Sequence, residues 1–134
     1  LTFENKKISK KNILAMQKKK TGELFGFCCE SIALIKGKNI KIRKKLKKIG
    51  INIGLLFQIT DDLIDYKGDE KIVGKPTKKD KIKGKATLVN LMGFKNALNY
   101  AKKLKKSINL DIIKLGNRSD ELIETVEFIL NRKF

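Results

Sequence analysis

Histidine and tryptophan are absent from this chain, and proline and cysteine are rare. Without histidine there is no imidazole base and no histidine metal ligand, which excludes Ser-His-Asp and Cys-His catalysis and most zinc chemistry. The two cysteines, Cys28 and Cys29, are neighbours. Neighbouring side chains on a helix point about 100° apart, so a disulfide between them is not expected. Free thiols with apolar neighbours indicate a reducing compartment, and we expect a cytoplasmic protein.

Long apolar runs are also missing. No stretch is long enough to span a membrane as a helix, and the first residues do not resemble a secretory signal. The 134 residues are 41% hydrophobic, which argues against disorder and is enough for one domain with a core. The first residue is not methionine, so we expect the chain to begin inside a longer protein.

The net charge of +18 comes almost entirely from lysine. Only three of the 32 basic residues are arginine, namely Arg43, Arg118 and Arg132. Proteins that read nucleic acids usually exploit the planar arginine side chain, whereas a lysine excess with many Ile and Asn is typical of an AT-rich genome. The composition therefore favours an anionic small substrate and no nucleic-acid partner. A basic helical nucleic-acid-binding module is the alternative from a different class.

Apolar residues recur with a helical period in four segments, and no segment alternates long enough to predict a strand. The expected fold class is therefore all-α. We expect Gly37 to end the first helix and Asn39 to cap the second. The predicted helices cover residues 9–36, 39–66, 86–106 and 119–133. Between the second and third, residues 67–85 are rich in glycine and lysine and predict a flexible, charged loop.

The most informative residues are 57–65, which place three carboxylates at the end of the second helix. Asp61 and Asp65 are four residues apart and share a helical face, with Asp62 beside them. Like charges at this spacing destabilise a helix slightly, so their presence suggests that the carboxylates have a functional role. Magnesium is usually held by one or two carboxylates together with substrate phosphates. The alternative is a solvated acidic helix end paired with nearby lysines.

Other residues in the chain suit a phosphate ligand. Lys20 offers a point charge and Thr21 a hydroxyl donor, although Lys20 also belongs to a lysine run that could simply face solvent. Gln58 lies three residues before Asp61 on the same helical face, within reach of a shared ligand. The alternative is that Gln58 is an ordinary polar residue of the helix. The predicted loop adds glycines, which allow the backbone to approach an anion closely, and lysines, which could close over that anion. These residues are in the segments Gly74-Lys75-Pro76, Asp80 and Gly84-Lys85-Ala86-Thr87.

Taken in this order, the motifs resemble the trans-isoprenyl diphosphate synthases, most closely the bacterial farnesyl and geranylgeranyl diphosphate synthases. The matching text is Lys20-Thr21-Gly22, residues 54–65, Gly68-Asp69, Gly74-Lys75, Asp80 and residues 84–88. The resemblance extends over nearly the whole chain. One departure is Val89, where the family often has proline; it affects the start of a helix more than the chemistry.

The resemblance implies an all-helical fold around a deep central cavity. It also implies a Mg²⁺-assisted reaction, in which an allylic diphosphate ionises and isopentenyl diphosphate attacks the resulting cation. Asp61 would bind a magnesium directly. Asp62 and Asp65 would support that metal, largely through waters, and Asp80 would accept a hydrogen bond from metal-bound water.

The resemblance likewise assigns roles to residues that contact the substrates. Lys20 and Lys75 would neutralise diphosphate oxygens as the leaving group gains charge, and Lys85 would make a weaker contact. Thr21 and Gln58 would lie near the reacting carbons and the diphosphate. The released diphosphate can accept the final proton, so the absence of histidine agrees with this family.

The family carries two aspartate-rich motifs that face each other, whereas this chain has a single Asp-Asp pair. We therefore expect residues 1–134 to be the C-terminal part of a single synthase domain, inactive alone and homodimeric when complete. The product would be farnesyl or geranylgeranyl diphosphate. A longer-chain polyprenyl diphosphate synthase and a non-catalytic subunit of a heteromeric synthase are the remaining alternatives.

Overall fold

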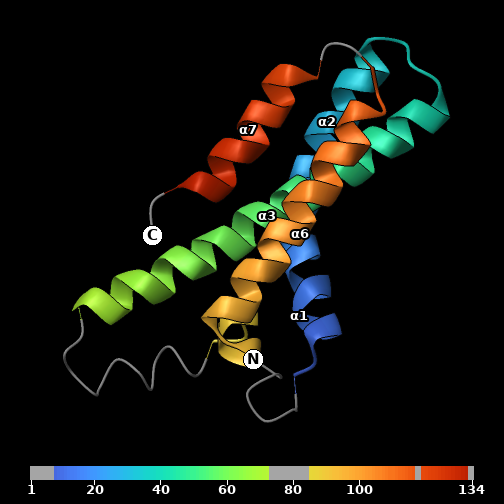
Figure 1. Ribbon diagram of the computed structural model, residues 1–134. Coiled ribbons are helices and arrows are strands. Elements are labelled where there is room, and N and C mark those ends of the chain that lie inside the picture. Colours follow the sequence, from blue (N-terminus) through green and yellow to red (C-terminus); the bar gives the residue numbers. More distant parts are fainter. Residues whose placement is uncertain (1–7, 73–84, 117–118, 133–134) are drawn as a thin grey trace.

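The computed structural model describes residues 8–72, 85–116 and 119–132, with only the backbone described for residues 69–72. Within these ranges the chain is helical throughout and has no strand, which confirms the predicted fold class. Figure 1 shows α3 crossing α6, while α2 and α7 pack against this pair. The elements are α1 (Lys10–Gln17), the π-helical turn η1 (Lys18–Gly22), α2 (Glu23–Ile35), α3 (Ile40–Ile72), α5 (Leu88–Met92), α6 (Phe94–Ile113) and α7 (Asp120–Asn131).

The first predicted helix is interrupted by the π-helical turn. Ser9 caps its start, where the Ser9 hydroxyl accepts a hydrogen bond from the Asn12 amide at 3.2 Å. Gly37 ends it as predicted, with a φ of +65° that favours glycine. A π-turn inserts one extra residue into a helix and is frequent at functional sites. Here the turn contains Lys20 and Thr21, the two residues that the sequence assigned to a diphosphate.

The long helix α3 begins as predicted. The Asn39 side-chain oxygen accepts a hydrogen bond from the Ile42 amide at 3.0 Å. The predicted end at Tyr66 was wrong, because α3 continues to Ile72 and takes in the start of the predicted loop. Tyr66 stacks on Phe94 of α6 at 5.9 Å between ring centroids, which holds the last turns of α3 in place.

Four glycines bring α2 and α3 into backbone contact. They are Gly22 and Gly26 on one side and Gly50 and Gly54 on the other. A β-carbon on Gly54 would lie 2.8 Å from the Gly22 α-carbon, and one on Gly50 would overlap the Phe25 carbonyl. This close crossing brings the π-helical turn against the middle of α3.

The helical period of apolar residues in 9–36 predicts one packed face, but several of the apolar residues in α2 are exposed. Leu24, Ile32 and Ile35 have exposed fractions of 65%, 62% and 82%. The packed face of α2 instead consists of small residues such as Gly26 and Ala33, because only these allow the close crossing. The described part of the chain leaves the outer face of α2 apolar and uncovered.

The third predicted helix is divided in two. Gly93, with a φ of +86°, separates α5 from α6, and α6 continues to Ile113 rather than ending at residue 106. The core lies between α3, α6 and α7, with contributions from Leu56, Ile59, Leu63, Ala97, Ala101, Ile108, Ile112 and Val126. Among the residues described, no helix is both long and apolar enough to cross a bilayer.

Candidate active site

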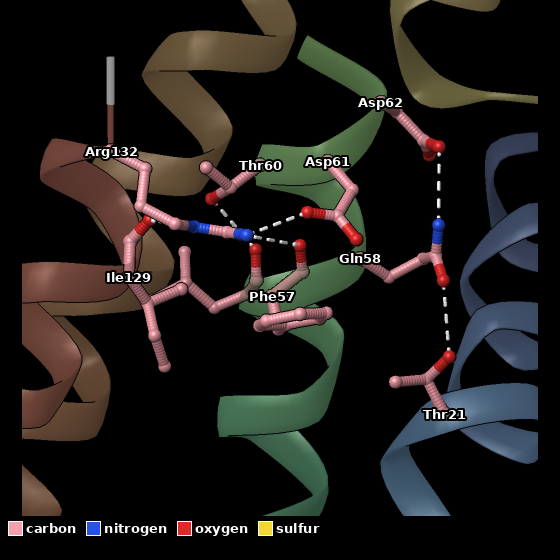
Figure 2. A network of polar contacts seen from close by, with 9 residues as sticks. Thr21, Phe57, Gln58, Thr60, Asp61, Asp62, Ile129 and Arg132 are labelled. Atoms are coloured by element: carbon pink, nitrogen blue, oxygen red, sulfur yellow. Dashed lines mark hydrogen bonds and ion pairs between the residues drawn. The ribbon is translucent and has the colours of Figure 1, made fainter. Parts of the chain in front are cut away.

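The carboxylates of α3 project in different directions, so each meets a different set of partners. Figure 2 shows Asp61 directed toward Arg132 of α7, and Asp62 directed toward Gln58 and the π-helical turn. Consecutive residues on a helix are turned by about 100°, which accounts for this divergence.

A chain of hydrogen bonds joins Asp62 to the first helical segment. Gln17 donates its side-chain amide to Asp62 Oδ2 at 2.7 Å, and Gln58 donates to Asp62 Oδ1 at 3.2 Å. Thr21 donates its hydroxyl to Gln58 Oε1 at 3.0 Å (Figure 2). The sequence placed Thr21, Gln58 and Asp62 at one site, and the structure does bring these three together.

Gln17 was not recognised from the sequence. It has an exposed fraction of only 3%, and its side-chain oxygen has no hydrogen-bond partner among the residues that the structure describes. A polar side chain in a predominantly apolar helical face is the signal that could have revealed it, because buried amides almost always hydrogen-bond.

The environment of Asp62 favours its protonated form. The pKa of Asp62 is raised to about 6. Burial is the main cause, and the charges of Asp65 and Asp61 also raise this pKa. The hydrogen bond from Gln58 and the charge of Lys20 act in the opposite direction. Lys20, although exposed, therefore lies close enough to influence the carboxylates.

This raised pKa predicts how stability depends on pH. The folded state holds the Asp62 proton more tightly than the unfolded state, where the pKa is near 3.8. The contribution of Asp62 to the free energy of unfolding should be complete below pH 3.8 and decline until the pH exceeds about 6. Asp62→Asn should remove this decline and be relatively more stable at neutral pH. Urea denaturation of both proteins across this range measures it; parallel curves would contradict the assignment.

Arg132 makes four contacts at the site. Its Nη1 lies 2.8 Å from Asp61 Oδ1, and its Nη2 donates to the Phe57 carbonyl at 3.3 Å. Its Nε donates to the Ile129 carbonyl at 3.1 Å, and the guanidinium lies 4.4 Å from the centroid of the Phe57 ring. No role at the site was predicted for Arg132 from the sequence. The chain has only three arginines, and this rarity is the signal that could have drawn attention to Arg132.

Lys85 lies near two of the carboxylates. It lines a small cleft together with Asp62 and Asp65, which the residues Tyr66, Thr87, Val89 and Asn90 complete. Both Asp65 and Lys85 are exposed there. The two remaining predicted site residues, Lys75 and Asp80, lie outside the described residues.

The donors at the end of α3 suit a hard divalent cation. All are carboxylate oxygens, which such a cation prefers. The Asp61 carboxylate is at present paired with the Arg132 guanidinium. Within the described ranges, however, no three carboxylates gather around one point that could hold a metal. Asp61 and Asp65 remain the pair that shares a helical face, so a metal here would need further oxygens from waters or substrate.

Comparison with known proteins identifies the class. Residues 1–126 match the model of the polyprenyl synthetase family, and the chain therefore belongs to that family. It is 35% identical over 132 residues to a short chain isoprenyl diphosphate synthase of Methanocaldococcus jannaschii. That match covers 96% of this chain and 38% of the archaeal protein.

Solved structures agree with this membership. An FPP/GFPP synthase from Zymomonas mobilis superposes with a TM-score of 0.77 at 34% identity, covering 96% of this chain and 41% of that one. A geranyltransferase from Helicobacter pylori, solved with magnesium and isoprenyl diphosphate, gives a TM-score of 0.75 at 31% identity. It is matched over 97% of this chain and 43% of its own. The chain thus spans about two fifths of the length of these relatives.

Proposed function

We propose that this chain is part of a magnesium-dependent prenyltransferase that joins isopentenyl diphosphate to an allylic diphosphate and releases diphosphate. The substrates would be dimethylallyl or geranyl diphosphate and the products farnesyl or geranylgeranyl diphosphate. The observation that carries the proposal is the meeting of the α3 carboxylates with the Thr21–Gln58 pair and with the nearby lysines Lys20 and Lys85. Family membership supports the reaction type.

In this proposal Asp61 would bind Mg²⁺ directly, and Asp62 and Asp65 would support that metal, largely through waters. The bound metal would stabilise negative charge on the departing diphosphate. Lys20 and Lys85 would bind diphosphate oxygens and lower the cost of the charge that develops there. Lys75 and Asp80, on the segment that is not described, keep their predicted roles of phosphate contact and acceptor for metal-bound water.

The hydrogen bonds of Gln58 give it a fixed orientation. Its amide nitrogen is committed to Asp62 and its oxygen to the Thr21 hydroxyl. Thr21 can therefore present only its lone pairs outward while this bond holds. We infer that the pair positions the reacting end of the allylic substrate relative to the carboxylates.

We further propose that residues 1–134 form the C-terminal part of one synthase domain, and that this part does not turn over alone. The uncovered apolar face of α2, with Leu24, Phe27 and Ile35 exposed, supports the first point. A helix that is apolar all round is normally buried on all sides. The remainder of the domain would cover this face and complete the central cavity. We expect the complete enzyme to be a cytoplasmic homodimer.

The complete protein should convert isopentenyl and allylic diphosphates to a prenyl diphosphate when Mg²⁺ is present, and should stop when EDTA is added. Product length separates a farnesyl or geranylgeranyl synthase from a longer-chain enzyme. Absence of any condensation product by the purified protein would contradict the proposal and favour a non-catalytic subunit. Salt-sensitive DNA binding without Mg²⁺-dependent diphosphate binding would favour the nucleic-acid alternative.

A further inference from the structure

Asp61 is not a free carboxylate in the folded chain. Its Oδ1 lies 2.8 Å from Arg132 Nη1, a distance typical of a charge-assisted hydrogen bond. The side chains of Arg132 and Asp61 are only 22% and 36% exposed, so solvent screens this pair less than a surface ion pair. Any cation that binds Asp61 must therefore contend with a cation that is already there.

The guanidinium is held in place by more than Asp61. Phe57 presents both its carbonyl and its ring to Arg132, at 3.3 Å and 4.4 Å respectively. The Ile129 carbonyl accepts from Nε at 3.1 Å. Because these three contacts do not involve the carboxylate, the positive charge would remain near Asp61 even if the ion pair were broken.

Asp62 and Asp65 have different surroundings from the arginine-paired Asp61. Asp62 accepts hydrogen bonds from the neutral amides of Gln17 and Gln58. Figure 2 shows that Asp62 and Gln58 lie on a different side of α3 from Asp61 and Arg132. Asp65 is exposed beside the cleft that Lys85 lines. The competing charge is thus directed at Asp61, the carboxylate that the proposed function assigns to direct metal binding.

We propose that Arg132 and the divalent cation compete for the Asp61 carboxylate, so that Arg132 sets the metal concentration at which this site fills. The inference rests on the proposed function in taking Asp61 as a metal ligand. Arg132 acts here through Asp61 and is a positioning residue. Its side chain links metal loading to the end of α7, because a metal on Asp61 would take the carboxylate oxygen that now pairs with the guanidinium.

The test is direct binding of Mn²⁺ to the complete protein without substrate, followed through the EPR signal of free Mn²⁺. Arg132→Gln removes the charge and should tighten Mn²⁺ binding about three- to tenfold, the range expected from losing one competing charge pair. Arg132→Lys keeps the charge and should bind Mn²⁺ nearly as the unmodified protein does. In an Asp61→Asn background, Arg132→Gln should have no effect on Mn²⁺ affinity.

Should Arg132→Gln fail to fold, Phe57→Leu provides a second variant. It removes the ring beneath the guanidinium while leaving the carbonyl contact, and should also tighten Mn²⁺ binding. Unchanged or weaker binding in the folded variants would overturn the competition and would mean that Arg132 supports the metal-bound carboxylate. Binding that is abolished by Asp61→Asn but insensitive to Arg132 would overturn this inference alone. No Mn²⁺ binding by any form, with or without inorganic diphosphate, would overturn the proposed function as well.

Discussion

Asp61→Ala in the complete enzyme is expected to lower kcat by about three orders of magnitude. A metal-bound carboxylate that helps neutralise a leaving group contributes several kcal/mol to the transition state, and each ~1.4 kcal/mol is a factor of ten in rate. The loss should appear in kcat more than in KM, because the charge on the leaving group grows only as the allylic bond breaks.

A control must separate this effect from the loss of any surface carboxylate. Asp120→Ala removes an exposed carboxylate from the first turn of α7, where it interacts with the helix dipole. It should cost under about 1 kcal/mol of stability and leave kcat unchanged. Steady-state kinetics with saturating Mg²⁺ compare the two variants. A near-normal kcat for Asp61→Ala would remove Asp61 from its proposed role.

The sequence predicted the helical fold well because apolar periodicity reports directly on helical faces. The helix α3 shows this, since the apolar residues Ile49, Ile53, Leu56 and Leu63 recur with a helical period and are buried. The end of α3 was predicted too early, because Gly68 was read as a loop signal. Tertiary packing of Tyr66 on Phe94 outweighs the weak helix preference of one glycine.

The candidate site was predicted in part. Motif spacing placed Gln58 and Asp62 on neighbouring positions of one helix, and the resemblance added Thr21 from another. The contacts of Gln17 and Arg132 could not be predicted, because they depend on how α1 and α7 approach α3. They lie 45 and 75 residues along the chain from their partners Asp62 and Phe57, beyond the reach of any local pattern.

Gly50→Ala is expected to be the most damaging small substitution in the described core. The added β-carbon would overlap the Phe25 carbonyl and lie 2.8 Å from the Gly26 α-carbon. Both are backbone atoms, which cannot turn aside as a flexible side chain can. The helices must separate, and overpacking of this kind costs about 1–3 kcal/mol and occasionally more.

The size of the effect depends on two opposing contributions. Alanine is a better helix former than glycine by about 1 kcal/mol, which offsets part of the clash. Gly68→Ala, in the same helix, is the matched control because nothing lies within 4 Å of its added β-carbon. That variant should gain up to about 1 kcal/mol, whereas Gly50→Ala should lose about 2 kcal/mol net. Urea denaturation of both variants measures the difference.

The consequence of Gly50→Ala should extend to the active site. Thr21 reaches Gln58 because Gly22 and Gly54, one helical turn along each helix, allow the same close crossing. Moving the helices apart should lengthen the 3.0 Å hydrogen bond between Thr21 and Gln58. It should also weaken the hydrogen bond that Gln58 donates to Asp62. We therefore expect a loss of kcat in Gly50→Ala even at temperatures where it is fully folded. Retention of full kcat in a destabilised Gly50→Ala enzyme would show that the crossing supports the fold without positioning the site.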